Sequence, residues 1–194
     1  MPLVVGLGNP GARYARTRHN VGWWVLERLI GRFRARVDPG TPSYRSWRCD
    51  VAGRDVTILA PLAFMNLSGE AIDAWRAEHQ LEPESMLVIC DDVYLPVGEL
   101  RVRPQGSSGG HRGLQSIERA LASLEFPRLR IGVGAVASGE LREYVLDEPM
   151  DEERERLEQE CDRAADAVEC WLGEGILATM NRFNRRVRRE VPEP

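Results

Sequence analysis

The stretch LVVGLGNPG at residues 3–11 places a short apolar run directly before a cluster of glycines. An apolar run of this length that is bounded by turn residues is typical of a buried β-strand, which we expect at residues 3–7. Glycine tolerates backbone conformations that other residues avoid, so the chain can turn tightly where the strand ends. We therefore predict a turn that presents Asn9 at the edge of a sheet.

The spacing of Gly6, Gly8 and Gly11 also matches the phosphate-binding loop of dinucleotide-binding proteins. In that motif the third glycine lies inside the opening helix, and an acid follows about 20 residues on, at the end of a second strand. Here Pro10 and a polar stretch separate the glycines from the next expected helix, and Glu27 falls in the middle of that helix. The sequence therefore predicts neither a dinucleotide site nor any other cofactor.

Outward from this stretch, segments with helical periodicity alternate with strand-like segments. We expect further strands at about 44–52, 55–60, 86–92, 99–103 and 129–134, and helices at about 21–36, 66–79, 110–124, 151–172 and 175–188. This alternation predicts an α/β fold, a sandwich with a mixed central sheet flanked by helices. The domain covers 1–194, with an arginine-rich helix and tail from about residue 175, and its site is expected at the C-terminal ends of the strands.

The composition indicates a cytoplasmic globular protein. Hydrophobic residues make up 43% of the chain and charged residues 29%, and no apolar run approaches the roughly 20 residues that span a membrane. The first residues carry no basic segment of the kind that begins a secretion signal. The four cysteines show no paired spacing, which favours free thiols in a reducing compartment.

The basic residues restrict the chemistry. All 26 are arginine, so the chain has no lysine for a Schiff base or for a phosphate-binding loop. The three histidines, His19, His79 and His111, form no HExxH motif or cysteine–histidine cluster, so we expect no metal.

The net charge of −4 is unevenly distributed. Residues 140–174 hold 14 acids and four arginines, whereas residues 1–112 hold 14 arginines and 12 acids. Local patches govern the binding of phosphate, so the total charge does not exclude an RNA partner.

Several polar residues are candidates for a functional site, although each could also have an ordinary structural role. His19 stands between an arginine and an asparagine just before a helix, where a histidine is often a surface or capping residue. Asn66 is a plausible helix cap, and His111 begins a helix after glycines, where it is structural or binds an anion. Asp91 and Asp92 end a buried strand, where acids either form a turn or orient a histidine.

The joint occurrence of these segments is more informative than any one of them. The chain carries GLGNPG at 6–11, TRHN at 17–20, FMNLSG at 64–69, DDVYLPVG at 91–98, SSGGHRG at 107–113, RLRIGVG at 128–134 and MNRFN at 180–184. In this order the blocks resemble the bacterial-type peptidyl-tRNA hydrolase family, and the resemblance runs from Val4 to about Asn184.

The resemblance implies a single-domain three-layer sandwich of the phosphorylase/hydrolase-like type. It also implies a monomeric cytoplasmic enzyme of translation, without an obligate protein partner. Such an enzyme hydrolyses the ester between a peptide and the 3′-terminal ribose of tRNA, with neither metal nor covalent intermediate. On the matching positions, His19 is the general base that activates water, and Asp91, chosen over Asp92 by the motif, orients its imidazole. Asn9 reads the first amide of the peptide, and Asn66 positions the water and the peptide backbone.

The resemblance also implies binding residues. Tyr14 and Phe64 contact the 3′ end of the RNA, and Met65 lines the cleft. His111 and Arg112 lie in the block that contacts substrate. The RNA phosphates are expected to contact basic residues at Arg101, Arg103, Arg128 and Arg130, since the arginine fork pairs well with phosphate.

One residue departs from the family pattern, because Arg112 occupies the place of an asparagine in the usual GGHNG. Arginine cannot accept a hydrogen bond. Either it pairs with Asp91 or Asp92, or it points into the mouth of the cleft and binds a phosphate or the oxyanion; we favour the mouth. The departure leaves a second hypothesis, a non-hydrolytic RNA-binding relative of the same fold, whereas an unrelated peptidase has little support.

Overall fold

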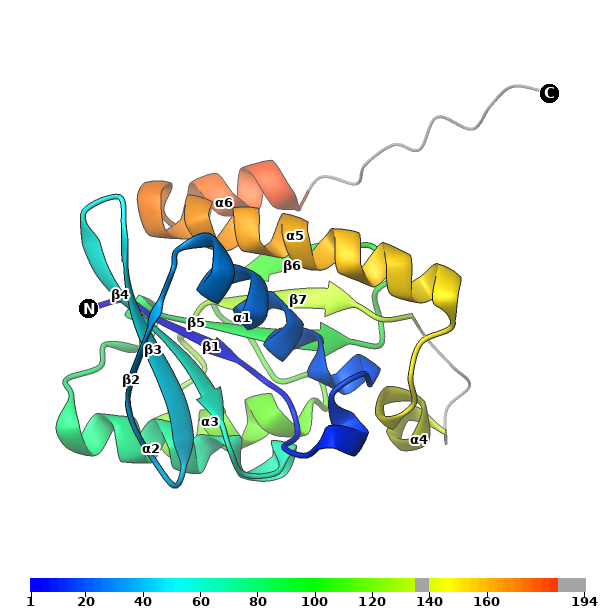
Figure 1. Ribbon diagram of the computed structural model, residues 1–194, viewed down its shortest axis with the longest axis horizontal. Helices are drawn as coiled ribbons and strands as arrows, with labels where there is room; N and C mark the ends of the chain where they lie inside the picture. The colour runs from blue at the N-terminus through cyan, green and yellow to red at the C-terminus, as the bar shows by residue number, and fades with distance from the viewer. Residues whose placement is uncertain (135–139, 185–194) are drawn as a thin grey trace.

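The computed structural model describes residues 1–134 and 140–184, and its centre is a seven-stranded mixed sheet (Figure 1). In space the strand order is β2-β3-β4-β1-β5-β7-β6. The strands are β1 (Leu3–Gly6), β2 (Arg36–Thr41), β3 (Tyr44–Val51), β4 (Arg54–Pro61), β5 (Met86–Asp92), β6 (Leu100–Arg103) and β7 (Arg128–Gly132). The central strands β4, β1, β5 and β7 are parallel, and the outer strands β2, β3 and β6 run antiparallel to their neighbours.

Helices cover both faces of the sheet. They are α1 (Val21–Arg32), α2 (Ser68–Glu78), α3 (Arg112–Leu121), α4 (Leu141–Leu146), α5 (Asp151–Glu174) and α6 (Ile176–Phe183). Figure 1 shows α1, α5 and α6 on one side of the sheet and α2 and α3 on the other, with α4 beyond the ends of β5 and β7. The predicted α/β sandwich with a mixed sheet is therefore confirmed.

The central strands form two cores because both of their faces are covered. In β5, Leu87 and Ile89 pack toward α1 and α5, whereas Met86, Val88 and Cys90 pack toward α2 and α3. Every residue of β5 is buried. A strand buried on both faces reads as a continuous apolar run, which is why residues 86–90 show no alternation.

The parallel pairing of β1 with β5 determines where the site forms. Gly6 of β1 lies beside Ile89 of β5, so both strands end at the same edge of the sheet. The chain after β1 carries Asn9 and then His19, and β5 ends in Asp91. Parallel pairing thus brings side chains that are distant in sequence to one edge.

The turn after β1 requires glycine because α1 packs directly against it. A Cβ on Gly22 would lie 2.4 Å from the Leu7 carbonyl oxygen, and one on Gly6 would lie 2.6 Å from the Gly22 oxygen. Two short 3₁₀ helices, Ala12–Tyr14 and Arg18–Asn20, bridge the turn and the helix. This close approach holds the segment that contains His19 against the sheet.

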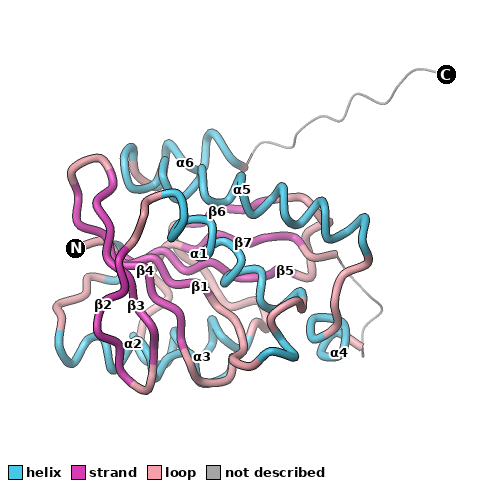
Figure 2. Tube along the Cα trace, in the orientation of Figure 1, coloured by secondary structure: helices cyan, strands magenta, loops and turns pink. Residues whose placement is uncertain are grey.

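One expected element ends earlier than predicted, and two described elements, β2 and α4, were not predicted. The helix expected to reach residue 36 ends at Arg32, because Arg34 adopts a left-handed backbone with φ 48°, and β2 follows. Figure 2 shows β2 as the outer strand beside β3. Residue 36 begins this strand and therefore cannot belong to the helix. The short helix α4 was not predicted. The expected terminal helix is α6, and residues 185–194 of the arginine-rich tail lie outside the described part of the chain.

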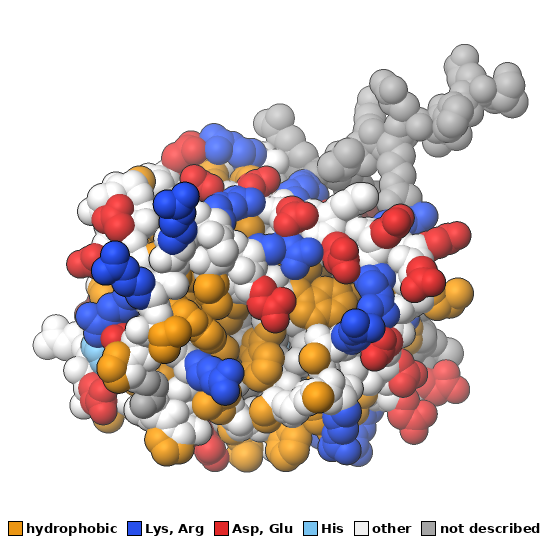
Figure 3. Space-filling view, viewed as in Figure 1, with side chains coloured by type: hydrophobic (Ala, Val, Ile, Leu, Met, Phe, Trp, Pro, Cys, Tyr) orange, Lys and Arg blue, Asp and Glu red, His pale blue; other side chains and the backbone are white. Residues whose placement is uncertain are grey.

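The acidic helix expected at 151–172 is α5, and its charges are partly paired with α1. Arg28 bonds Asp162 at 2.7 Å, and Arg32 bonds Asp166 at 2.7 Å. Figure 3 shows acids and arginines intermingled on this face of the molecule. None of the described helices is both long enough and apolar enough to cross a membrane.

Candidate active site

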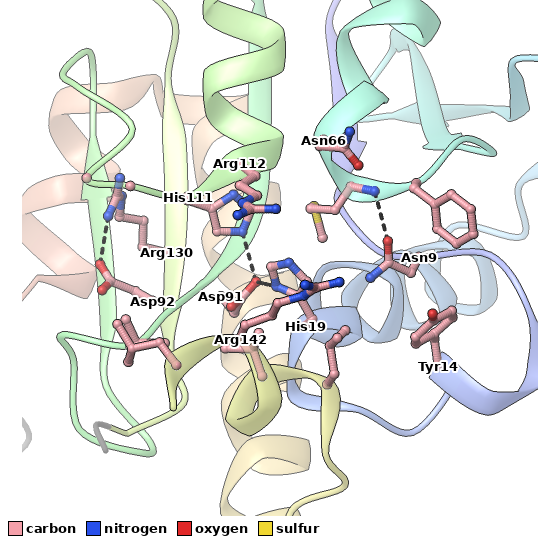
Figure 4. Close-up of a pocket in the computed structure, with 18 of the residues that line it drawn as sticks. Asn9, Tyr14, His19, Asn66, Asp91, Asp92, His111, Arg112, Arg130 and Arg142 are labelled. Carbon is pink, nitrogen blue, oxygen red and sulfur yellow. Dashed lines mark hydrogen bonds and ion pairs between the residues drawn. The ribbon is translucent and has the colours of Figure 1, made fainter. Parts of the chain in front are cut away.

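A cleft of about 630 Å³ opens at the strand ends that the sequence indicated. All nine of the predicted catalytic and substrate-binding residues line it together: Asn9, Tyr14, His19, Phe64, Met65, Asn66, Asp91, His111 and Arg112. Figure 4 shows the labelled side chains among these converging from the β1 turn, the segment before α2, the end of β5 and the start of α3. The structure therefore joins segments that are up to about a hundred residues apart in sequence.

His19 and Asp91 are hydrogen-bonded at the floor of the cleft. The Nδ1 atom of His19 lies 2.7 Å from Oδ1 of Asp91. Asp91 is 2% exposed and His19 retains 13% of its side-chain surface. An ionised carboxylate only accepts, so His19 Nδ1 carries the proton and Nε2 is left as the proton acceptor.

His111 shares the same carboxylate oxygen. Its Nε2 atom lies 2.9 Å from Asp91 Oδ1, and its Nδ1 accepts backbone N–H groups of Gly113 at 3.2 Å and Leu114 at 3.3 Å. Because Nδ1 accepts, the ring proton is on Nε2 and is donated to Asp91. His111 lines the cleft as predicted, but both of its nitrogens are engaged, so we correct its role from binding substrate to holding Asp91.

The pKa values of His19 and Asp91 are both shifted from their usual ranges. Burial lowers the pKa of His19, but the charge of Asp91 and its hydrogen bond outweigh burial and raise that pKa above 6.5. For Asp91, burial favours the neutral acid, yet the two neighbouring imidazoles hold the pKa of this carboxyl well below its usual range. Asp91 is therefore ionised throughout the neutral range.

The same three residues could in principle bind a metal ion, because two histidines and a carboxylate are common metal ligands. The side-chain atoms of His19, Asp91 and His111 that could bind it lie within 4.8 Å of one another. In this arrangement each histidine directs a protonated nitrogen at Asp91 Oδ1. A metal would have to displace both protons and the shared hydrogen bonds. The geometry fits proton sharing within the group.

Asn9 is fixed so that only its amide nitrogen faces the cleft. Its Oδ1 accepts the backbone N–H of Met65 at 2.8 Å. Its own backbone is held by Asn20, whose Oδ1 accepts Asn9 N–H at 2.9 Å and whose Nδ2 donates to the Asn9 carbonyl at 3.0 Å. Asn9 therefore presents Nδ2 as a donor, and Figure 4 shows this side chain on the opposite side of the cleft from His111.

Asn20 is a supporting residue that the sequence reasoning missed. It stands at the N-cap position of α1, but its side chain makes no cap hydrogen bond and is fully buried against Asn9. An amide both donates and accepts, which is what pairing with a backbone N–H and C=O requires. Its position next to His19 in the TRHN motif could have indicated this supporting role.

Aromatic side chains form one end of the cleft. Tyr14 and Phe64 meet edge to face with ring centroids 6.3 Å apart, and the Arg13 guanidinium lies 4.4 Å from the Tyr14 ring centroid. Phe64 is 51% exposed, while the neighbouring Met65 is buried. Exposed aromatic faces of this kind can stack on bases or on apolar groups.

Asn66, Arg112 and Arg142 lie at the mouth of the cleft, and all three are exposed. Arg112 is the first residue of α3, as expected, and neither Asp91 nor Asp92 pairs with it. The alternative in which Arg112 competes with His19 for Asp91 is therefore not realised. Figure 4 shows Arg112 reaching the cleft from α3 and Arg142 from α4. Arg142 was missed because no recognised block covers α4.

The four arginines expected to contact RNA phosphates divide into two pairs. Arg101 and Arg103 are exposed on β6, alternating with the buried Leu100 and Val102. On the neighbouring strand, Arg128 is only 1% exposed.

The prediction that Arg128 contacts phosphate is wrong. Its guanidinium bonds the Gly106, Leu124 and Phe126 carbonyls and lies 3.6 Å from Glu118. These acceptors offset the energetic cost of burying the positive charge. They also occupy the guanidinium, so it is not available to a ligand.

The guanidinium of Arg130 also bonds acceptors within the protein. Its guanidinium pairs with Asp92 at 2.9 Å and bonds the Ser107 and Ser108 carbonyls. It borders the cleft, but its donors hold the loop that leads to His111. We therefore also withdraw Arg130 as a primary phosphate contact.

These features define a class of protein: a three-layer α/β enzyme fold with a hydrogen-bonded histidine–aspartate pair at the floor of its cleft. The family model of peptidyl-tRNA hydrolase matches residues 3–191. The chain belongs to the peptidyl-tRNA hydrolase family, and the resemblance seen in the sequence is confirmed.

Known relatives agree with this assignment. The peptidyl-tRNA hydrolase of Syntrophomonas wolfei is 40% identical over 184 residues, which cover 95% of this chain and 100% of the relative. That of Haemophilus influenzae (strain 86-028NP) is 42% identical over 185 residues, covering 94% and 95%. The crystal structure of peptidyl-tRNA hydrolase from Acinetobacter baumannii matches with a TM-score of 0.89 at 33% identity, covering 95% of this chain and 94% of that one.

Proposed function

We propose that this chain hydrolyses the ester bond between the peptide and the 3′-terminal ribose of peptidyl-tRNA, with His19 as general base. The observation that carries the proposal is the 2.7 Å contact between His19 Nδ1 and Asp91 Oδ1. This contact fixes the tautomer in which Nε2 accepts a proton, at the floor of a cleft that is open to water. The products are free tRNA and an N-blocked peptide.

The reaction needs two proton movements, and His19 performs both. Nε2 takes a proton from water while the water oxygen bonds to the ester carbonyl carbon, whose π electrons move to the carbonyl oxygen. The bond to the ribose oxygen then breaks, and this oxygen takes the proton from Nε2, which restores the neutral histidine. Asp91 stays ionised and stabilises the intermediate imidazolium.

Asn9 stabilises the oxyanion or reads the adjoining peptide carbonyl. Its Nδ2 is its remaining donor group, because Met65 N–H occupies Oδ1. A preorganised donor is worth most where charge develops during the reaction. Asn66, which is exposed at the mouth, adapts to the water and to the peptide backbone, and an amide does so irrespective of peptide sequence.

The RNA lies along the aromatic end and the β6 edge. Tyr14 and Phe64 contact the terminal nucleotide, Arg112 binds at the mouth, and Arg101 and Arg103 pair with backbone phosphates. These two arginines suit that role because both are exposed.

We further propose that the chain acts as one domain and as a monomer in the cytoplasm, without cofactor, metal or obligate protein partner. Residues from the N-terminal third and the middle of the chain line one cleft, which supports a single functional unit.

The direct test is release of peptide from N-acetyl-aminoacyl-tRNA by the purified protein. We expect cleavage of this ester, much slower cleavage of aminoacyl-tRNA with a free amino group, and no loss of rate in a metal chelator. An intact N-acetyl ester after prolonged incubation, with tRNA binding retained, would instead support the non-hydrolytic RNA-binding hypothesis. That hypothesis is less favoured, since a pure binder has no evident need for the His19–Asp91–His111 group.

A further inference from the structure

Arg18 precedes the proposed general base but extends away from the cleft. It belongs to the 3₁₀ helix Arg18–Asn20, and its side chain is 6% exposed. A buried guanidinium has five donors to satisfy. What it bonds therefore shows which part of the fold it holds.

The carbonyl acceptors of Arg18 lie at the C-terminal end of α4 and in the two residues that follow it. Its Nη1 atom lies 3.3 Å from the Tyr144 carbonyl oxygen, 3.3 Å from that of Asp147 and 3.2 Å from that of Glu148. The Arg18 backbone N–H also donates to the Asp147 carbonyl at 3.2 Å. The final carbonyls of a helix have no partner within the helix, and a cation at that end is favourable.

Two further contacts complete the attachment. The guanidinium carbon lies 4.1 Å from the Tyr144 ring centroid, and Nη2 pairs with Glu153, in the first turn of α5, at 2.5 Å. Arg18 thus joins the His19 segment to both α4 and α5.

Among the described residues, helix α4 has few other attachments. It is six residues long, and Val145 is its one buried residue. The Tyr144 hydroxyl donates to the Val133 carbonyl at 2.7 Å. A helix this short is not stable in isolation, so its position depends on such tertiary contacts.

The same helix forms one wall of the cleft. Leu141, Arg142, Val145 and Leu146 all line it, opposite the His111–Arg112 segment. Figure 4 shows Arg142 reaching from α4 toward His19. Displacement of α4 would therefore change the space for substrate while the His19–Asp91 bond stays in place.

We propose that Arg18 is a positioning residue that anchors α4 as a wall of the substrate cleft, so that it sets substrate affinity rather than the chemical step. The inference rests on the proposed function for its kinetic consequence. The anchoring itself rests only on the contacts between Arg18 and the end of α4.

The test compares Arg18→Met with Arg28→Met in the full-length protein. Arg28 is a matched control, because it also bonds a carboxylate and two carbonyls but lies on the α1–α5 face. Amide hydrogen exchange of residues 141–148 reports on the anchor, and steady-state kinetics with N-acetyl-aminoacyl-tRNA report on its consequence.

For Arg18→Met we expect exchange in α4 to accelerate about tenfold or more relative to α3. We also expect KM to rise about tenfold, kcat to stay within about threefold, and the pH profile of kcat to be unchanged. Arg28→Met should leave α4 exchange and KM as in the wild type. Unchanged α4 exchange in Arg18→Met, or a fall in kcat at constant KM, would overturn the proposal.

Arg18→Lys keeps the test valid if the methionine variant does not fold. Lysine retains a cation near the α4 carbonyls but lacks the planar fork, so exchange and KM should lie between those of the wild type and the expected values for Arg18→Met. Wild-type values for both in a folded Arg18→Lys protein would contradict the proposal. If the wild type fails to hydrolyse the ester while α4 exchange still responds to Arg18, the anchor stands and the proposed function falls.

Discussion

At the floor of the cleft, His19, Asp91, His111 and Asn9 are joined to fixed partners, whereas Asn66, Arg112 and Arg142 at the mouth have no ion pair or side-chain hydrogen bond to the described residues. The floor residues are buried or nearly so, and those at the mouth are exposed. Fixed, desolvated groups suit a chemical step whose charges always develop at the same atoms. Exposed side chains suit a substrate whose peptide varies in sequence. Substitutions at the floor should therefore change kcat, and those at the mouth should change binding modestly.

The largest effect is expected at the general base. His19→Ala should lower kcat by about 100- to 10,000-fold, because the water loses its proton acceptor. Binding of tRNA, measured by filter retention, should stay near the wild-type value. His79→Ala is the matched control, since His79 stacks on Trp75 away from the cleft, and it should remain active. A fully active His19→Ala protein would end the proposed mechanism.

Asn9→Asp isolates the donor at the floor. Aspartate keeps an oxygen for the Met65 N–H but replaces Nδ2 with a second acceptor, so the oxyanion loses its donor and faces a carboxylate instead. We expect kcat to fall about 100- to 1000-fold, as for loss of one oxyanion donor. The thermal midpoint checks that the variant is folded at the assay temperature. Wild-type kcat in a folded Asn9→Asp protein would remove Asn9 from the reaction.

Asp91→Asn tests the shared carboxylate through pH dependence. The pKa of His19 is raised by Asp91, so the wild-type rate should fall as pH drops through a value above 6.5, where His19 gains a second proton. In the variant burial alone remains, which lowers the pKa, so this limb should move to lower pH. The plateau should fall by roughly tenfold, less than for His19→Ala, because the imidazolium loses its counter-charge. An unmoved limb would show that Asp91 does not control His19.

Arg112→Asn restores the usual family residue at the mouth. Because Arg112 has no ion pair with Asp91 or Asp92, removing it should not release His19. We expect kcat/KM to stay within about tenfold of the wild type, a barrier change near 1.4 kcal/mol. A gain of about a hundredfold or more would mean that this arginine suppresses catalysis.

The smallest effects are expected on the β6 edge. Arg101→Ala and Arg103→Ala should each reduce the salt dependence of tRNA affinity by roughly one unit of slope at most, with kcat unchanged. Arg48→Ala provides a control. This exposed arginine lies on β3 and pairs with Asp38 on β2, so the variant should keep the wild-type salt dependence. Affinity that does not vary with salt would contradict a role for the β6 arginines.

Local signals predicted much of the fold. The apolar run of β5, the glycines after β1 and the periodicity of α1 are properties of short segments, because periodicity reports which side chains face a core. The same signals failed at β2, since a left-handed backbone at Arg34 ends α1 early and the partner of β2 is the hairpin that follows. They also failed at α4, whose six residues are held by contacts from distant Arg18.

The sequence by itself determined the family, the sheet-edge position of Asn9 and the identity of the candidate base, because ordered motifs record residue types and spacings. Only the tertiary structure decided which charged groups bond partners within the protein and which stay exposed. Arg101 lies beside Arg130 and Arg103 beside Arg128 in the register of β6 and β7. The loop carbonyls of Gly106, Ser107 and Ser108 cover the β7 pair and leave the edge strand exposed. Likewise, Asp91 rather than Asp92 meets the histidines, because adjacent residues of a strand point to opposite faces.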